Sequence, residues 1–317
     1  MEVKISVVIP TYRRPGLLVN CMEALRRQTF HKNAYEVIVV SDGPDETTAE
    51  ILAEYPEVKL LPTAVKKGPA AARNRGWLEA KGRLIAFTDD DCIPDSNWLQ
   101  TLWQYYQDED EIAYTGPVVV PLSSPPTDYE QNIANLETAE FVTANCACTK
   151  KALLKVGGFD ERFRMAWRED SDLHFKFLEH NIPIHSTPAT VVHPARKAQW
   201  GVSIREQKKG IFNALLYKKY PGLYKQRIRP RPLWNYYAMV LLFAGIIPAL
   251  MFRQTWLALA FAGGWLALAL IFSKKRLSAT SHATNHVAEM MLTSLVIPFL
   301  SLYWQFYGAC KYRVLIL

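Results

Sequence analysis

Three consecutive carboxylates, Asp89-Asp90-Asp91, are the residues of this chain whose types and spacing first suggest chemistry. Like charges a few ångströms apart repel one another, so such a run is unfavourable unless a positive group lies among the carboxylates. A divalent cation would supply that charge, because hard oxygen ligands suit Mg²⁺ or Mn²⁺ and a diphosphate can complete the coordination shell. The alternative is a solvated acidic turn that caps the helix after Pro94, and it fits an isolated acidic run equally well.

The elements that must position this run alternate between strands and helices. This alternation is typical of an α/β fold with a doubly wound parallel sheet, in which ligands bind at the carboxyl ends of the strands. Asp42 and the acidic run both follow predicted strand ends, although Asp42 also lies in a turn-rich loop and could cap the next helix. Strands are predicted at residues 5–9, 36–40, 58–61, 84–88 and 113–120, and helices at residues 17–28, 49–52, 68–79 and 98–106.

The charge of the chain is unevenly distributed. The formal net charge is +7, yet residues 1–194 are acidic, whereas residues 195–232 contain 11 Lys and Arg against one acidic residue. A basic segment can bind nucleic acid, but this one lies directly before an apolar tail, which favours anionic lipid headgroups. Residues 200–220 mix apolar side chains with Lys and Arg, which predicts an amphipathic helix on a membrane surface; an ordinary packed helix is the alternative.

The tail contains three apolar stretches. Tyr236–Phe252 and Thr255–Phe272 are near the lower length limit for crossing a bilayer, and the short linker Arg253-Gln254 makes them a tight hairpin. Basic residues flank both ends of the hairpin, which predicts that both ends lie in the cytoplasm. The third stretch, Val287–Tyr307, spans the membrane, re-enters it or lies at its interface. We expect domain boundaries that give segments 1–195, 196–232 and 233–317.

The compartment of the N-terminal domain follows from two further features. Its first apolar run has only five residues, which is too short for a signal peptide, so we expect this domain on the cytoplasmic face of a cell membrane. The five cysteines form no C-x-x-C pair, which predicts reduced thiols in place of a zinc site or a disulfide framework.

Six motifs resemble, in order, those of glycosyltransferase family 2, whose members have the GT-A fold. The resemblance covers about the first 195 residues and implies a bacterial-type, membrane-associated member. It implies a Rossmann-like, mostly parallel sheet. The amphipathic interfacial helix and the transmembrane or re-entrant helices expected after this sheet follow from the charge and apolar patterns of the sequence. The matching segments are Val7 to Tyr12, Val39 to Gly43, Gly68 to Gly76, Phe87 to Pro94, Gly157 to Glu161 and Arg168 to Leu173.

The resemblance implies a nucleotide site and a metal site. Asp42 would accept a hydrogen bond from the nucleobase, and Asp91 and Asp89 would bind Mn²⁺ or Mg²⁺. His193 is the candidate third ligand, although a lone His is more often structural. The full set of expected nucleotide contacts is Pro10, Thr11, Tyr12, Arg14, Asp42, Arg73, Asp89 and Asp90.

The resemblance also implies where the chemical step and the sugar contacts lie. Asp170 would be the general base that takes the proton of the acceptor hydroxyl, because a carboxylate at its ordinary pKa is ionised and available. Acidic residues are also common in the first turn of a helix, where they complement the helix dipole, so this reading has a structural alternative. Contacts to the donor or acceptor sugar are expected from Asn145, Gly158, Trp167 and Glu169.

These expectations combine into one function: inverting, metal-dependent transfer of a sugar from a nucleoside diphosphate, with UDP favoured, to a lipid-linked acceptor. The product would belong to a cell-envelope polysaccharide or glycolipid, and no nucleic acid partner is expected. Residues 196–200 do not fit the Q-x-x-R-W motif of processive synthases, which favours single addition. A polyprenyl-phosphate sugar synthase and a non-catalytic, nucleotide-binding membrane component remain alternatives.

Overall fold

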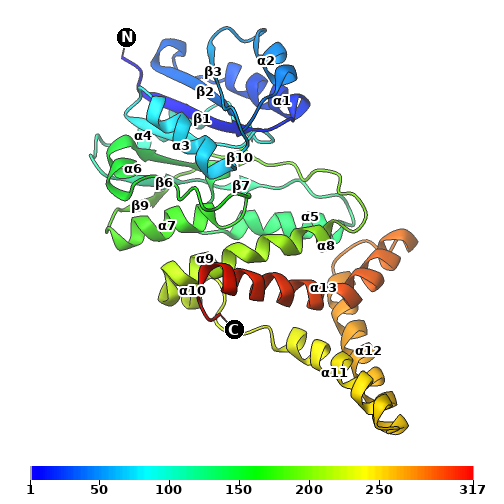
Figure 1. Ribbon diagram of the computed structural model, residues 1–317. Coiled ribbons are helices and arrows are strands. Elements are labelled where there is room, and N and C mark those ends of the chain that lie inside the picture. Colours follow the sequence, from blue (N-terminus) through cyan, green and yellow to red (C-terminus); the bar gives the residue numbers. More distant parts are fainter. Residues whose placement is uncertain (1, 317) are drawn as a thin grey trace. The chain divides into compact units, whose positions relative to one another are not determined.

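The computed structural model describes residues 2–316, which form two compact units. The first unit comprises the residues up to Pro121 together with Ala134–Ala195, and the second comprises Leu122–Ile133 and the chain from Arg196 onward. Figure 1 labels the helices and strands. No sequence pattern predicted that Leu122–Ile133 would belong to the second unit.

The central sheet of the first unit has seven strands in the order β3-β2-β1-β4-β8-β6-β9. β8 is antiparallel to both neighbours and every other adjacent pair is parallel, which confirms the mostly parallel sheet. All residues of β1 and β4 are buried, as central parallel strands covered on both faces must be. The strands are β1 (Ile5–Thr11), β2 (Tyr35–Ser41), β3 (Val58–Pro62), β4 (Leu84–Phe87), β6 (Ala113–Thr115), β8 (Cys146–Thr149) and β9 (Ile184–Ser186).

The helices of the first unit begin where the sequence provides suitable first turns. α1 and α3 begin with proline, whose fixed φ and missing N–H suit a helix N-terminus. The loop after β2 caps α2 through Asp45, whose side chain accepts a hydrogen bond from the Thr48 N–H; Asp42 is not the cap. The helices are α1 (Pro15–Arg26), α2 (Glu46–Leu52), α3 (Pro69–Glu79), α4 (Trp98–Tyr105), α6 (Lys150–Val156) and α7 (Glu169–Glu179), with short 3-10 turns at Lys32–Ala34, Ala134–Thr138 and Thr143–Asn145.

An apolar core fixes α3 against the sheet. Trp77 of α3 and Phe177 of α7 lie in one buried cluster with Val8 of β1 and Phe87 of β4. Gly76 permits the close approach of α3 to β1, because a Cβ at this position would lie 2.3 Å from a methyl carbon of Val8. The packing therefore brings the first half of α3 to the carboxyl ends of the central strands.

Two predictions about secondary structure were wrong. The strand expected at residues 113–120 is divided into β6 and β7 (Val118–Val119), because the chain bends at Gly116, where a Cβ would lie 2.1 Å from the carbonyl oxygen of Ala189. β7 joins a second sheet of order β5-β10-β7, with β5 at Ile93–Pro94 and β10 at Val191–Val192. The single helix expected at residues 200–220 is instead α8 (Val202–Glu206), a 3-10 turn (η4, Gln207–Gly210) and α9 (Ile211–Lys219).

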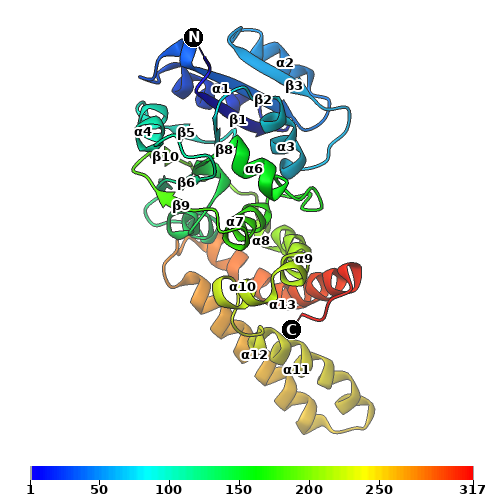
Figure 2. The ribbon, with the colours of Figure 1, turned by 90° about the vertical axis from the view of Figure 1, so that its left-hand side faces the viewer.

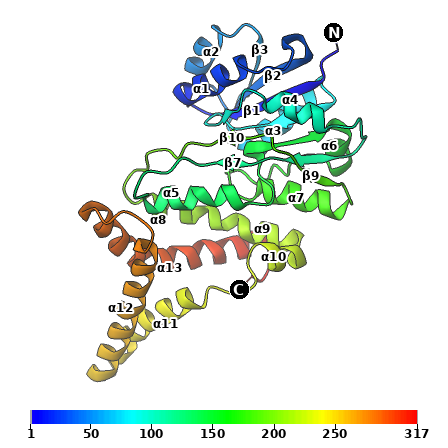
Figure 3. The same cartoon turned by 180° about the vertical axis from the view of Figure 1, so that it is seen from behind.

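The second unit contains three long apolar helices, α11 (Trp234–Met251), α12 (Thr255–Leu277) and α13 (Thr284–Tyr312), besides α5 (Asp128–Ile133) and α10 (Pro221–Arg227). Each of the three is long and apolar enough to cross a membrane, which supports membrane association. α11 and α12 form the expected hairpin (Figure 2). Within this hairpin, Gly245 lies against Phe261 and Gly264 against Leu242. α13 runs beside α8, η4 and α9 (Figure 3).

Candidate active site

The carboxyl ends of β1, β2 and β4 lie side by side and gather the predicted nucleotide-binding residues. β1 pairs with β2 up to Thr11 opposite Ser41, and with β4 up to Val8 opposite Phe87. The acidic run therefore begins beside the end of β1, where the Thr11 hydroxyl donates a hydrogen bond to Asp90 Oδ2 at 2.7 Å.

The repulsion expected within the acidic run is present in the structure. Asp90 is almost fully buried, and burial together with the neighbouring charge of Asp91 raises its pKa to about 6. Arg14 opposes this effect: its Nη1 lies 3.4 Å from Asp90 Oδ1 and 3.8 Å from Asp91 Oδ2. Because the Arg14 side chain is 42% exposed and therefore partly screened by water, it offsets the repulsion between the carboxylates only in part. An additional positive group would stabilise the acidic run further.

His193 joins the acidic run through the second sheet. The antiparallel pairing of Val192 with Ile93 places His193 beside Asp91, with 3.5 Å between Nε2 and Oδ1. Ligand atoms of Asp89, Asp91, Cys92 and His193 all lie within 4.8 Å of one another. His193 Nδ1 is buried and has no hydrogen-bond partner among residues 2–316.

The donor set of this cluster fits a divalent cation. Two carboxylates and an imidazole are ligands that Mn²⁺ accepts, and an imidazole without another partner is free to take a ligand role. Cys92 is fully buried, and burial raises the pKa of its thiol well above its ordinary value, so the thiol is neutral. From the sequence, Cys92 was expected only to be a reduced thiol. Its position directly after the acidic run is the sequence feature that could have placed it in this cluster.

Arg73 of α3 connects the acidic run to the first turn of α7. Its Nη2 lies 2.6 Å from Asp89 Oδ1, and its Nη1 lies 3.3 Å from Glu169 Oε1. The guanidinium is only 2% exposed, so both ion pairs are shielded from water on the arginine side. One buried cation therefore links two acidic motifs that are 80 residues apart in the chain.

The first turn of α7 carries Glu169 and Asp170. Arg168, which precedes the helix, has φ +74°, a left-handed conformation that is costly for a residue with a Cβ. Burial and the adjacent Asp170 raise the pKa of Glu169 to about 7, even though Arg73 favours its charged form. Burial also raises the pKa of Asp170, whose Oδ1 accepts the Ser171 N–H at 2.6 Å. Glu169 Oε2 is buried without a hydrogen-bond partner among the described residues.

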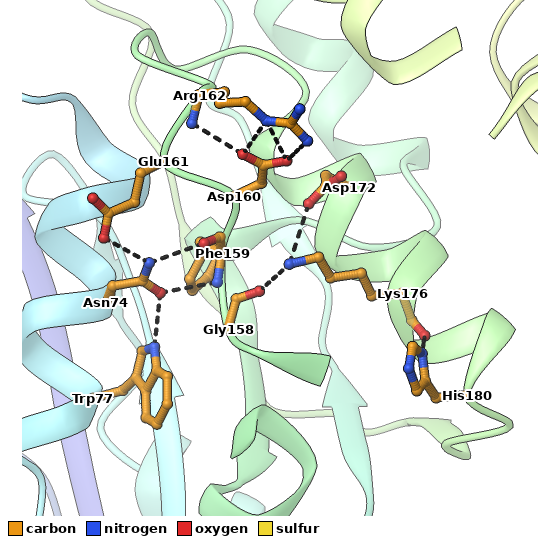
Figure 4. A network of polar contacts seen from close by, with 10 residues as sticks. All are labelled: Asn74, Trp77, Gly158, Phe159, Asp160, Glu161, Arg162, Asp172, Lys176 and His180. Atoms are coloured by element: carbon orange, nitrogen blue, oxygen red, sulfur yellow. Dashed lines mark hydrogen bonds and ion pairs between the residues drawn. The ribbon is translucent and has the colours of Figure 1, made fainter. Parts of the chain in front are cut away.

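A polar network holds the loop that leads to α7 (Figure 4). The side-chain amide of Asn74 donates to the Phe159 carbonyl and accepts the Phe159 N–H, both at 2.9 Å, and its oxygen also accepts the Trp77 indole N–H. Lys176 donates to the Gly158 carbonyl at 2.6 Å. The neighbouring residues Arg73 and Asn74 thus fix the acidic run and this loop from the same turn of α3.

The predicted nucleobase pocket is assembled at the ends of β1 and β2. Asp42 is buried and accepts the N–H groups of Lys67 and Gly68 at 2.7 and 2.8 Å, which orients its carboxylate. The Lys66 ammonium lies 3.5 Å from the centre of the Tyr12 ring, a cation–π contact that the sequence analysis missed. Pro10 is the penultimate residue of β1 and is buried.

All four predicted sugar contacts have other partners in the structure, and that of Glu169 is Arg73. Asn145 is fully buried; its amide donates to the carbonyls of Pro117 and Ala189 and accepts the Trp98 indole N–H, so it holds the bend after β6. Gly158 packs against Asn74 and Trp77, and Trp167 is covered by the Arg168 guanidinium, 4.6 Å from its ring. The geometry gives Asn145 a structural role and lends no support to a sugar contact there.

Asn74 and Lys66 were not among the site residues expected from the sequence. Asn74 lies inside the matched segment from Gly68 to Gly76, so its position in that motif was a usable signal. Lys66 lies just before that motif, and no residue pattern marks it.

Comparison with known proteins identifies a family. A family model described as “Glycosyl transferase family 2” matches residues 6–167, just over half of the chain. The chain is 36% identical over 100 residues to “Glycosyltransferase AglE” of Haloferax volcanii, which covers 30% of this chain and 33% of that protein. It is 30% identical over 228 residues to “Pre-mycofactocin glycosyltransferase” of Mycobacterium tuberculosis, which covers 63% of this chain and 46% of that protein. The chain therefore spans less than half the length of these two relatives.

A solved structure supports the fold. The crystal structure of GalNAc-T7 with UDP, GalNAc and Mn²⁺ is similar with a TM-score of 0.52 at 17% sequence identity, over 66% of this chain and 47% of that chain. The likeness concerns the fold alone, and together with the mostly parallel sheet it confirms the GT-A architecture.

Proposed function

We propose, since the chain belongs to glycosyl transferase family 2, that it moves one sugar from a nucleoside diphosphate to a lipid-linked acceptor held in a membrane. The observation that carries the proposal is the chain of contacts from Asp89 through Arg73 to Glu169, the neighbour of Asp170. It joins the acidic run, where we place the donor, to the residue directly before the carboxylate that we assign as the base. The product is a cell-envelope glycan or glycolipid precursor.

The donor binds at the carboxyl ends of β1, β2 and β4. Asp42, already fixed by two backbone N–H groups, accepts the imide proton of a uracil base, and Tyr12 offers its ring for stacking. Arg14 moves from the acidic run to the diphosphate when a cation takes its place, because both positions offer it negative charge. These contacts suit a UDP-sugar.

Asp89, Asp91 and His193 would hold the cation, Mn²⁺ or Mg²⁺. When bound, the cation stabilises the charge that develops on the departing diphosphate. Asp90 is kept out of this set by its hydrogen bond from the Thr11 hydroxyl.

Asp170 accepts the proton of the acceptor hydroxyl as that oxygen attacks the anomeric carbon. Attack from the side opposite the diphosphate inverts the configuration at that carbon. Glu169 positions Asp170: its tie to Arg73 fixes the first turn of α7 relative to the acidic run. The raised pKa of Asp170 makes it a stronger base once it is ionised.

The acceptor comes from the membrane. The basic segment 196–232 and the apolar helices that follow it would keep the catalytic domain at an anionic membrane surface, on the cytoplasmic face where nucleotide sugars are made. The phosphate groups of a lipid-linked acceptor are attracted to the Lys and Arg side chains of the basic segment.

The test is transfer from radiolabelled UDP-sugars to polyprenyl-diphosphate-linked acceptors by the purified full chain. Asp170→Asn should lower kcat by about 10²- to 10⁴-fold and leave UDP binding intact. Glu179→Gln, an exposed carboxylate near the other end of α7, is the matched control and should keep full activity. Full activity in Asp170→Asn would favour direct attack by a phosphate acceptor, which needs no base, and UDP binding without any turnover would favour a non-catalytic role.

Metal dependence has a separate readout. Mn²⁺ with UDP should raise the thermal unfolding temperature of the wild type, because a ligand that binds only the folded chain stabilises it. When the ligand concentration is about 100 times its Kd, this stabilisation is about 2.7 kcal/mol. Asp91→Asn should abolish that increase. An increase that is unchanged in this variant, or that EDTA does not remove, would contradict the assignment.

A further inference from the structure

We infer that α13 lies along the membrane surface and does not cross the bilayer, so that only the α11–α12 hairpin enters the hydrocarbon. The observation is the layer of charged and polar groups that accompanies α13 within the second unit. By length and composition alone α13 could span, since its 29 residues measure about 43 Å. The contacts of α13 with the segments packed beside it argue against a transmembrane position.

Polar and charged groups of residues 201–229 contact α13 near both of its ends. Near its start, Glu289 accepts the Gly201 N–H at 2.7 Å. Toward its end, the Lys208 ammonium lies over the Trp304 ring, and Arg229 donates to Gln305 at 2.8 Å. Glu289 and Gln305 are 16 residues apart, about 24 Å along the helix, which is less than the hydrocarbon thickness of about 30 Å. A spanning α13 would therefore carry charged groups from at least one end into the hydrocarbon, where charge is strongly disfavoured.

The end of α12 gives a second, independent constraint. Arg276 donates to the hydroxyl of Thr293 at 2.7 Å and forms an ion pair with Asp128 of α5 at 2.7 Å. Thr293 lies within the apolar part of α13, so a spanning α13 would draw Arg276, Asp128 and the adjacent Lys274-Lys275 toward the bilayer core. A surface position keeps all of these charges at the headgroup level.

The exposed face of α13 has the pattern of an interfacial helix. Most of its exposed apolar side chains lie on one side of the helix, because Leu292, Val296, Tyr303, Phe306 and Tyr307 follow one another at intervals of four, seven, three and one residues. Met291 is also exposed and lies beside this stripe. About a third of its most apolar window is buried within the protein (33%), against 11% for α11 and α12, which are apolar on all sides. One apolar stripe beside basic neighbours fits the boundary between anionic headgroups and acyl chains.

The C-terminal end of α13 then lies on the same side of the membrane as the catalytic domain, because a hairpin returns the chain to the side from which it entered. Lys311 and Arg313 therefore stay on the side rich in basic residues, as the distribution of Lys and Arg in membrane proteins requires. This conclusion does not depend on the proposed reaction.

Depth measurements on spin-labelled full-length protein in vesicles of phosphatidylcholine and phosphatidylglycerol test the inference. Leu292→Cys and Phe306→Cys, each in a Cys310→Ser background, place labels 14 residues apart on the same stripe. A surface helix gives the two labels equal, shallow depths, and Leu266→Cys in the middle of α12 gives a deep reference. A depth difference approaching 21 Å between the first two labels, about 1.5 Å per residue, would overturn the inference.

Thiol labelling gives a second test that uses the natural sequence. Cys310 near the end of α13 is exposed, whereas the other four cysteines are buried. A membrane-impermeant maleimide should react with Cys310 in inverted vesicles and not in intact spheroplasts. Lys151→Cys with Cys310→Ser reports the side of the catalytic domain and should behave identically. Reaction of Cys310 and Cys at position 151 from opposite sides would show that α13 spans.

Discussion

At the scale of single residues, Arg73 links the two acidic parts of the site. Its guanidinium contacts Asp89 and Glu169, and it is buried. A buried arginine between two carboxylates is worth little net stability as a whole, yet the loss of the arginine alone leaves uncompensated buried charge. The loss of folding stability when Arg73 is replaced therefore measures how strongly the arginine compensates the buried carboxylates.

Arg73→Met should lower the free energy of unfolding by about 3 kcal/mol, because Glu169 loses its counter-charge in a buried position. Thermal or denaturant unfolding in detergent provides the measurement. Arg75→Met is the matched control: Arg75 is exposed on the same helix, and its loss should change stability by no more than about 0.5 kcal/mol. Equal effects of the two substitutions would contradict the linking role of Arg73.

The pKa of Glu169 predicts a pH dependence of stability. Burial raises this pKa from its ordinary value near 4.3 to about 7, so the folded chain binds more protons than the unfolded chain between these values. Stability should therefore be greatest below this window and fall as the pH rises through it. Glu169→Gln cannot ionise, so its unfolding temperature should fall less between pH 5 and pH 7 than that of the wild type. Parallel pH profiles would refute this, and Glu179→Gln should retain the wild-type profile.

At the scale of elements, the site depends on the loop between α6 and α7. Gly157 and Gly158 both have positive φ, at +72° and +61°, but their surroundings differ. A Cβ on Gly157 would meet no atom within 4 Å, whereas a Cβ on Gly158 would lie 2.7 Å from Asn74 Oδ1 and 2.8 Å from Trp77. The second glycine therefore serves packing as well as conformation.

Gly157→Ala should cost about 1 kcal/mol, the price of a left-handed backbone for alanine, whereas Gly158→Ala should cost clearly more because it also displaces Asn74. The displaced loop carries Arg168 and the first turn of α7, so kcat should fall in Gly158→Ala and not in Gly157→Ala. Unfolding curves and transfer assays on both variants separate these effects. Indistinguishable variants would show that the crowding at Gly158 is unimportant.

At the scale of the whole molecule, the basic segment should couple catalysis to lipid charge. Each Lys or Arg near an anionic surface contributes about 1 kcal/mol of attraction, which salt screens. Replacing the exposed cations Lys197, Arg205, Lys225 and Arg231 with Gln should slow transfer several-fold in vesicles with anionic lipid. In zwitterionic vesicles the variant and the wild type should be equally slow.

A charge-matched control distinguishes this effect from a change in net charge. Gln at four exposed cations of the catalytic domain, Arg27, Lys81, Lys151 and Lys155, removes the same charge from the first unit. This control should keep the wild-type response to anionic lipid. If both variants lose the same amount of activity in anionic vesicles, the effect depends only on net charge, and the basic segment does not couple catalysis to lipid charge.

The sequence by itself determined the features that local patterns control. Buried strands at residues 5–9, 36–40 and 84–88 follow from short apolar runs, although in the structure the strands end at Thr11, Ser41 and Phe87. The hairpin of α11 and α12 follows from two apolar stretches with a two-residue linker. Because the carboxyl ends of parallel strands share one edge, the acidic run and Asp42 could be placed at a common site before any coordinates were known.

Only the tertiary structure decided how distant segments meet. Gly116 divides a predicted strand because Ala189 lies against it, and His193 reaches Asp91 only through the pairing of β10 with β5. Arg73 and Asn74 acquire their roles from contacts with residues about 85 to 96 positions away. The surface position of α13 likewise depends on which helices pack beside it. Such contacts arise from long-range packing, which no short window of sequence contains.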